Sequence, residues 1–143
     1  VRFFTVYGEY GRPDMAPYKF TDALINNKEL EIFNYGDHIR DFTHVSDVVN
    51  ALIKLIKFIP KEKIPYKIYN IGSSNPNSIK YFLSIIQNII RKKANLKYLP
   101  LQKGDVHKTF ADTSQLINKI KFKVKIDLEK GIAEYIKWFK SYY

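Results

Sequence analysis

The chain has 143 residues, of which 45% are hydrophobic and 27% charged, so it is long and apolar enough for one globular domain with a core. It has no cysteine, which excludes disulfides, zinc–thiolate sites and cysteine nucleophiles. The net charge of +10 raises the question of nucleic-acid binding. The lysines are spread along the chain and no basic–aromatic module of known pattern is present, so we expect no nucleic-acid partner.

The first quarter of the chain reads as strand, loop, helix and strand. Residues 2–7 are rich in Phe, Val, Thr and Tyr, which predicts a buried strand. Gly8 and Gly11 punctuate a loop, and a helix is predicted from about residue 16 to residue 26. A short strand is predicted over 30–36.

The rest of the chain alternates extended segments with amphipathic helices. In chain order we predict a strand at 40–45, a helix from Ser46 to about Phe58, a strand at 67–72, a helix over 79–90, an extended segment at 96–101, a short helix capped by Asp112 or Thr113, and a last helix capped by Asp127. This order predicts a mixed α/β domain spanning residues 1–143. Its strands are too few and scattered for a self-sufficient doubly wound sheet.

Several signatures of catalysis and targeting are missing from the sequence. The six glycines form neither G-x-G-x-x-G nor a P-loop, no Tyr is followed four places later by Lys, and there is no G-x-S-x-G. We therefore expect no catalytic residues in this chain. It shows no run of roughly 20 apolar residues and no signal-peptide pattern, so we expect a cytoplasmic protein without a membrane partner.

Three polar residues, His38, Asp41 and His44, could be imagined as metal ligands. They fall in a predicted strand and a helix entry, where a buried or surface-paired histidine is the more common finding. We expect no metal site.

The segments RFFTVYGEYGRPDM and IRDFTHVSDV give the chain a resemblance to a known family. Further landmarks follow in the family's order: YNIGSSNPNSI, GDVHKTFADTSQL and GIAEYIKWFKSYY. The chain resembles the C-terminal, substrate-binding part of an NAD-dependent nucleotide-sugar epimerase/dehydratase of the extended short-chain dehydrogenase type. The subfamily that it resembles most is that of the UDP-glucuronate 4-epimerases of capsular polysaccharide biosynthesis.

The resemblance implies that this is one part of a larger enzyme. In the family, the Gly-rich NAD loop and the Tyr-x-x-x-Lys pair lie in an N-terminal Rossmann half. The fold implied for this chain is therefore the C-terminal portion of a Rossmann-type enzyme, a small mixed α/β lobe that lacks the dinucleotide-binding half. We expect it to be a shortened, processed or split form of such an enzyme.

The resemblance also implies a reaction. In the family, NAD takes a hydride from C4 of the sugar, the 4-keto sugar turns over, and the hydride returns to its other face. We expect the chain to be the substrate-binding part of a UDP-uronate 4-epimerase for surface polysaccharide precursors, inactive alone and homodimeric as a complete enzyme. The alternatives are a UDP-glucuronate decarboxylase or dTDP-hexose dehydratase fragment, which GRPDM disfavours, and a non-catalytic nucleotide-sugar-binding remnant.

By this resemblance, the sugar and the nicotinamide would lie at the start of the chain. Arg12 would clamp the C6 carboxylate with its planar guanidinium; the alternative is a solvated turn residue. Thr5 would reach the carboxylate or a phosphate, or serve only as a strand former. Phe3 and Val6 would lie near the nicotinamide of NAD, and core packing accounts for both equally well.

The nucleotide would be held by two later segments. Phe33 would lie against the uracil, with Glu31 offering backbone hydrogen bonds, or else Phe33 is a core residue of an edge strand. Arg40 would bind the diphosphate, or pair with the adjacent Asp41. Asp105 would accept hydrogen bonds from the ribose hydroxyls, or is an ordinary turn residue.

Two positions depart from the galactose-type epimerases. Gln102 stands where those enzymes have Arg, which implies a weaker phosphate contact. Thr109 corresponds roughly to a Tyr in those enzymes, which implies a different sugar pocket.

Overall fold

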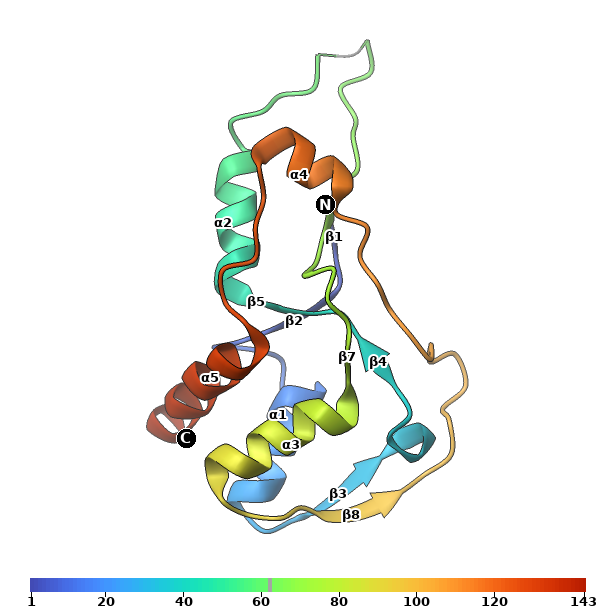
Figure 1. Cartoon of the computed structure of the whole chain (residues 1–143), viewed down its shortest axis with the longest axis vertical. Coiled ribbons are helices and arrows are strands. Elements are labelled where there is room, and N and C mark those ends of the chain that lie inside the picture. The colour runs from blue at the N-terminus through green and yellow to red at the C-terminus, as the bar shows by residue number, and fades with distance from the viewer. Residues whose placement is uncertain (62) are drawn as a thin grey trace.

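Figure 1 shows the computed structural model, which describes residues 1–61 and 63–143. The helices are α1 (Ala16–Ile25), α2 (Val45–Leu55), α3 (Ile79–Ile90), α4 (Ser114–Ile120) and α5 (Leu128–Tyr142), with a 3₁₀ turn η1 at Phe33–Gly36. The strands are β1 (Arg2–Phe3), β2 (Thr5–Tyr7), β3 (Glu29–Ile32), β4 (Ile39–Arg40), β5 (Phe42–His44), β6 (Asn70–Ile71), β7 (Asn77–Ser78) and β8 (Asn95–Tyr98).

The described strands form short pairs. β1 pairs with β6, β2 with β5 and β3 with β8, all in parallel, whereas β4 and β7 are antiparallel. In Figure 1, α2 and α4 lie toward one end of the long axis, and α1, α3 and the β3–β8 pair lie toward the other. The predicted mixed α/β class is confirmed.

The prediction of one buried strand over residues 2–7 is wrong. The Val6 N–H turns back to the Phe4 carbonyl at 3.0 Å, and this bend divides the segment into β1 and β2. Tyr7 is buried, but Phe3 is 51% exposed. Tyr7 packs in the larger apolar cluster, whereas Phe3 belongs to neither apolar cluster.

Most other boundaries are shorter than predicted because turns interrupt the extended segments. The strand predicted at 30–36 ends at Ile32, the one at 40–45 is split at Asp41, the one at 67–72 is reduced to Asn70–Ile71, and the one at 96–101 to Asn95–Tyr98. Helix α2 ends at Leu55 and not at Phe58. Its N-cap is His44, not Ser46, since His44 Nδ1 accepts a hydrogen bond from the Ser46 N–H at 3.3 Å.

The cap predicted for the last helix is confirmed, and the one predicted for the short helix is confirmed in position. Asp127 Oδ1 accepts the N–H of Lys130 at 2.8 Å and so begins α5. The N-cap of α4 is Thr113, whose side chain makes no capping bond, and Asp112 Oδ1, one residue earlier, accepts the N–H of Ser114 at 3.0 Å. Side-chain caps of this kind satisfy N–H groups that have no partner within the helix.

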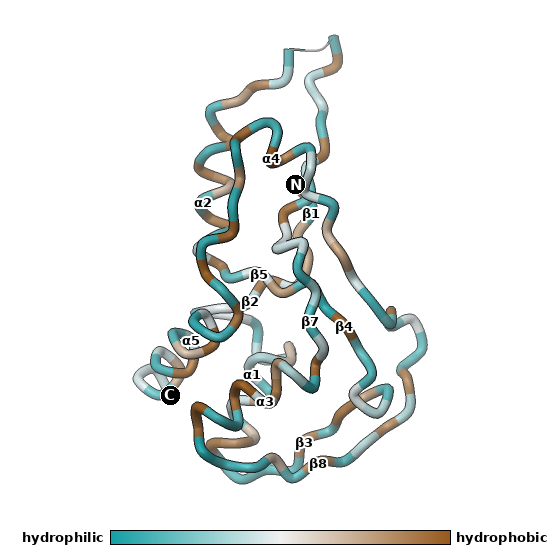
Figure 2. The backbone as a smooth tube through the Cα atoms, viewed as in Figure 1, coloured by the Kyte–Doolittle hydropathy of each residue, from teal (hydrophilic) through white to brown (hydrophobic). Residues whose placement is uncertain are grey.

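The buried apolar side chains form two clusters. The larger one joins β2, α1, β3, α3 and α5 around Phe82 and Tyr135, and the smaller one joins α2, β6 and α4 around Ile71 and Leu116. Figure 2 shows hydrophobic and hydrophilic segments alternating along α2 and α3, as expected for helices with one buried face.

Two contacts bring the end of the chain back onto its middle. Buried Asp47 on α2 accepts the N–H groups of Lys125 and Ile126, both at 3.1 Å. Gly131 on α5 lies so close to Tyr7 that a Cβ at this position would overlap the Tyr7 hydroxyl. Among the residues described, no helix is both long and apolar enough to cross a membrane.

Candidate functional site

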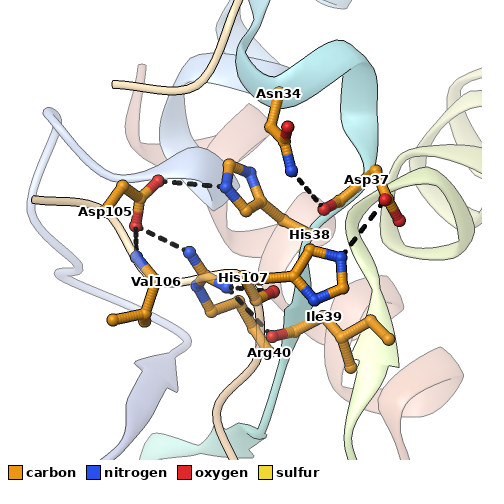
Figure 3. Close-up of polar contacts among 8 residues, drawn as sticks. All are labelled: Asn34, Asp37, His38, Ile39, Arg40, Asp105, Val106 and His107. Atoms are coloured by element: carbon orange, nitrogen blue, oxygen red, sulfur yellow. Dashed lines mark hydrogen bonds and ion pairs between the residues drawn. The ribbon is translucent and has the colours of Figure 1, made fainter. Parts of the chain in front are cut away.

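Arg40 is the best-placed cation of the predicted site. It ends β4, and its side chain is only 14% exposed. Its guanidinium donates through Nη1 to the carbonyls of Ile39 at 3.0 Å and His107 at 3.1 Å, and through Nη2 to Asp105 Oδ1 at 2.8 Å (Figure 3). These bonds fix the orientation of the guanidinium before any ligand is present.

Asp105 reaches Arg40 from a loop 65 residues later in the chain. The loop is held beside β4 by two backbone bonds, from Ile39 N–H to the His107 carbonyl at 3.0 Å and from Thr109 N–H to the Ile39 carbonyl at 3.1 Å. Asp105 Oδ1 also accepts the N–H of Val106 at 2.8 Å. The Arg40 and Asp105 side chains, predicted as separate ligand contacts, therefore lie together.

Two histidines add to this group. His38 is buried, and its Nε2 lies 3.3 Å from Asp105 Oδ2. Burial lowers the pKa of His38, and the nearby positive charge of Arg40 lowers it further, while Asp105 acts in the opposite direction. His107 Nε2 lies 3.2 Å from Asp37 Oδ2 at the exposed rim (Figure 3).

A tight turn between β3 and β4 presents these residues. Asn34, Tyr35 and Gly36 all have positive φ, at 48°, 52° and 77°. Asn34 Nδ2 donates to the Asp37 carbonyl at 2.6 Å, and Tyr35 N–H donates to the Leu99 carbonyl at 3.1 Å, so the left-handed turn is fixed from both sides. Half-buried Phe33 opens the turn, near the 99–109 loop.

Asp41 does not pair with Arg40. It is fully buried, and its carboxylate accepts bonds from Ser73 N–H at 2.6 Å, Ser73 Oγ at 2.7 Å, Ser74 N–H at 3.0 Å and Ala111 N–H at 2.9 Å. Asp41 therefore ties β4 to the turn after β6 and to the end of the 99–113 loop. The alternative of an Arg40–Asp41 ion pair is wrong, because these donors already occupy the carboxylate.

The predicted carboxylate clamp lies apart from this group. The Arg12 side chain is 76% exposed and forms a two-pronged pair with Asp14, at 3.0 Å and 2.5 Å. Thr5 is half-buried in β2, and its N–H donates to the Asp41 carbonyl at 3.1 Å. Among the described residues, no hydrogen bond or ion pair joins Arg12 to Thr5, Arg40 or Asp105.

The remaining predicted positions are more scattered. Glu31 is exposed and pairs with Lys97 at 3.1 Å across β3 and β8. Gln102 is exposed, and its carbonyl accepts the N–H of Asp105 at 3.2 Å. Thr109 Oγ1 accepts the N–H of Asp41 at 3.0 Å, so its hydroxyl supports β4.

Phe3 and Val6, which were predicted to lie near the nicotinamide, stand on the two short strands β1 and β2. Phe3 is at the open side of β1, and Val6 packs against the smaller apolar cluster. The described residues also include no Gly-rich phosphate loop, since the chain's six glycines do not have that spacing. The residues of this chain therefore do not fit NAD by themselves.

Sequence reasoning did not place His107 in this site, and it considered His38 and Asp41 only as conceivable metal ligands, with Asp41 also as a possible partner of Arg40. The alternation of the strand at 38–42 was the only available signal, because it places His38 and Arg40 on one side and Asp41 on the other. Of the three residues considered as metal ligands, Asp41 already accepts hydrogen bonds through its carboxylate, and His44 Nδ1 accepts the N–H that caps α2. Within the described residues no group of three His, Asp or Glu side chains could hold a metal ion.

The family model for the NAD dependent epimerase/dehydratase family matches residues 1–72. The chain belongs to that family. It is 45% identical over 139 residues to an uncharacterised protein of Methanocaldococcus jannaschii, covering 97% of this chain and 41% of that one. It is 38% identical over 157 aligned positions to Protein CapI of Staphylococcus aureus, covering 100% of this chain and 47% of that one.

The fold also matches solved epimerases. A crystal structure of UDP-glucuronic acid 4-epimerase from Bacillus cereus, in complex with UDP-glucuronic acid and NAD, superposes with a TM-score of 0.91 at 30% identity. The match covers 99% of this chain and 45% of that enzyme. The chain thus spans less than half the length of these relatives.

Proposed function

We propose that this chain is the nucleotide-sugar-binding part of an NAD-dependent 4-epimerase that acts on a UDP-uronate. The observation that carries the proposal is the Arg40–Asp105 pair at 2.8 Å, with His38 beside it, on a chain similar to a UDP-glucuronic acid 4-epimerase. This group offers a guanidinium for phosphate oxygens and a carboxylate for hydroxyl donors within one small region.

In the proposed complex, Arg40 binds the diphosphate and Asp105 accepts from the ribose hydroxyls. Phe33 and the backbone of Glu31 hold the uracil, and Gln102 borders the phosphates. These positions lie on two adjacent segments, residues 31–41 and 102–107, which backbone bonds join at Ile39. A diphosphate would share the Arg40 guanidinium with Asp105, so a modest affinity is expected for the nucleotide alone.

At the other end of the ligand, Arg12 and Thr5 would hold the sugar carboxylate. A carboxylate ligand would replace Asp14 on the Arg12 guanidinium, which needs little rearrangement because Arg12 is exposed. A guanidinium–carboxylate pair is two-pronged and charge-assisted, whereas a neutral hexose offers only a hydroxyl.

The contribution of this chain to the reaction is positioning. It would fix the nucleotide through Arg40 and Asp105 so that the sugar reaches the reacting groups in one orientation. NAD supplies the hydride chemistry in this family, and it would be held by a segment outside this chain, in a cytoplasmic, homodimeric enzyme of surface polysaccharide synthesis. We derive no catalytic step for the residues of this chain.

The test is a titration of the isotope-labelled chain with UDP, followed by NMR. Shifts should concentrate at residues 31–41 and 102–107, and Arg40→Met should abolish them, whereas Lys137→Met, at an exposed position of α5, should leave them intact. Shifts elsewhere would contradict the assigned pocket. Incubation with UDP-glucuronate and NAD should give no epimer, and turnover above a heat-killed control would contradict the positioning role.

A further inference from the structure

Helix α5 contacts the chain on both sides of the loop at residues 8–15. Before the loop, Tyr7 lies against Gly131, in the first turn of the helix. After the loop, Tyr18 of α1 contacts Phe139, with the ring centroids 5.2 Å apart. A single helix therefore fixes the two ends of this loop relative to each other.

Tyr10 gives the loop a third contact with α5, in the middle of the loop. Trp138 and Tyr142 stack on each other with centroids 5.0 Å apart, and we call these two rings the α5 platform. The Tyr10 ring meets both edge-on, at 5.1 Å and 5.6 Å between centroids. Separations of this size are typical of favourable edge-to-face aromatic pairs. Tyr10 is 76% exposed, so these rings hold it at the surface, outside both apolar clusters.

The backbone of Tyr10 is in a conformation that a bulky residue rarely adopts. Its φ is 57°, in the left-handed region, which is unfavourable for a residue with a Cβ. Such a conformation persists where the surrounding contacts hold it, and the α5 platform provides such contacts. Next to Tyr10, the Gly11 N–H donates to the Gly8 carbonyl at 3.3 Å, and the Met15 N–H donates to the Arg12 carbonyl at 3.2 Å. The contacts of Tyr10 thus set the direction of the chain immediately before Arg12.

We propose that Tyr10, held on the α5 platform, is a positioning residue that orients the loop of Arg12 for a carboxylated sugar. The inference rests on the proposed function, in which Arg12 binds the sugar carboxylate. Tyr10 acts through the backbone, two residues before Arg12. A two-pronged guanidinium–carboxylate pair requires one relative orientation of the two groups, whereas a single bond to a hydroxyl is less demanding. Loss of loop order therefore weakens the binding of a carboxylated sugar more than that of a neutral one.

The first experiment measures the order of the loop in the chain without ligand. Trp138 is the only tryptophan of the chain, so its fluorescence reports on the α5 platform. Tyr10→Asn removes the ring but places a residue that tolerates the left-handed conformation, and Tyr10→Phe keeps the ring. Tyr10→Asn should change the emission of Trp138 and speed the amide exchange of Gly11 and Met15 roughly three- to tenfold, the size of one aromatic pair. Tyr10→Phe should resemble the unaltered chain.

Variants of the helix test the same contact from the other side. Trp138→Ala should speed the amide exchange of the loop as Tyr10→Asn does, and Trp138→Phe should restore slow exchange because it keeps a ring. Lys137→Ala, at the adjacent exposed position of α5, should have no effect. The urea midpoint of each variant checks that the fold is retained. Tyr10→Asn is at an exposed position, so it decides the question even where Trp138→Ala fails to fold.

The second experiment compares the dissociation constants of UDP, UDP-glucose and UDP-glucuronate by NMR titration of the labelled chain. The unaltered chain should bind UDP-glucuronate more tightly than UDP-glucose. Tyr10→Asn should reduce this preference roughly three- to tenfold and leave the Kd of UDP unchanged. Tyr10→Phe should keep the preference. A merely structural role of Tyr10 would instead weaken the binding of all three ligands alike.

Three results would overturn the positioning role of Tyr10. They are unchanged amide exchange of the loop in Tyr10→Asn, an unchanged preference for UDP-glucuronate in that variant, and no preference in the unaltered chain. Failure of the unaltered chain to bind UDP would instead contradict the proposed nucleotide site. The two failures are distinguishable, because amide exchange of the loop in Tyr10→Asn is measured without a nucleotide.

Discussion

Asp41 accepts a hydrogen bond from the N–H of Ala111 at 2.9 Å, across 70 residues of sequence. Removal of this carboxylate leaves the buried N–H of Ala111 and the partly buried N–H groups of Ser73 and Ser74 without an acceptor, and each buried group without a partner costs roughly 1–3 kcal/mol. Asp41→Ala should therefore lower the free energy of unfolding by roughly 3 kcal/mol or more in urea titration. Asp14→Ala should leave the urea midpoint unchanged, because Asp14 is exposed. Equal effects of the two variants would contradict the structural role of Asp41.

Gly131→Ala has two opposing effects on stability: it increases helix propensity and it overpacks the contact of α5 with Tyr7. Ala is favoured over Gly inside a helix by about 1 kcal/mol, but a Cβ here would overlap the Tyr7 hydroxyl and lie 3.0 Å from His44 Cδ2. Overpacking of this kind typically costs about 1–3 kcal/mol, so the net effect on unfolding free energy should be destabilising. Glu134→Ala, at an exposed site of α5, is the control and should be close to neutral. A higher melting temperature for Gly131→Ala would mean that α5 moves away at little cost.

The buried histidine predicts an acid-sensitive fold. The pKa of His38 is lower in the folded state than its ordinary value of about 6.5, so the unfolded chain binds more protons around this pH. Stability should be fully present above about pH 6.5 and should fall as the pH decreases toward the lowered folded pKa. His38→Gln cannot take up this proton. Its unfolding free energy, measured from pH 7.5 to 5, should therefore have a smaller slope, and an unchanged slope would assign the acid sensitivity to other groups.

Arg12 should select a carboxylated sugar in an intact enzyme rebuilt with a dinucleotide-binding segment. Arg12→Met keeps much of the aliphatic stem and removes the guanidinium, and charge-assisted pairs contribute on the order of 1.5–3 kcal/mol. The variant should lower kcat/KM for UDP-glucuronate by roughly ten- to a hundredfold and affect UDP-glucose far less. Lys19→Met, an exposed change of the same type on α1, is the control.

The structure also predicts an effect of the partner of Arg12. Asp14 occupies the guanidinium, so Asp14→Ala should lower KM for the carboxylated substrate and leave the neutral one unaffected. Equal losses of kcat/KM on both substrates in Arg12→Met would indicate that Arg12 has a structural role. No loss on either would mean that the loop faces solvent in the complete enzyme.

The helices were predictable because their signals are local. The spacing of Ile79, Phe82 and Ile86 is enough to predict α3, and Asp127 is enough to predict the start of α5. The strand boundaries were not, because bends at Phe4 and Asp41 depend on bonds to distant segments.

The contrast between local signals and contacts with distant segments also explains which parts of the candidate site were predictable. Arg40 and Asp105 were predicted from their motifs, but their mutual pairing was not, because nothing in either motif specifies the packing of a loop 65 residues away. The position of His38 beside Asp105 was not predicted for the same reason, since Asp105 lies on that loop.

The bonds that Asp41 and Asp47 form with the last third of the chain have a consequence for how it folds. Asp47 is bonded to residues 78 and 79 positions later, and Asp41 to one 70 positions later, so long loops must close before these contacts can form. Proteins dominated by such distant contacts fold in milliseconds to seconds, more slowly than helical bundles. The Arg40 site should therefore assemble late, after residues 105–111 reach β4, and a nascent chain that ends before this loop would carry the arginine without the group that orients it.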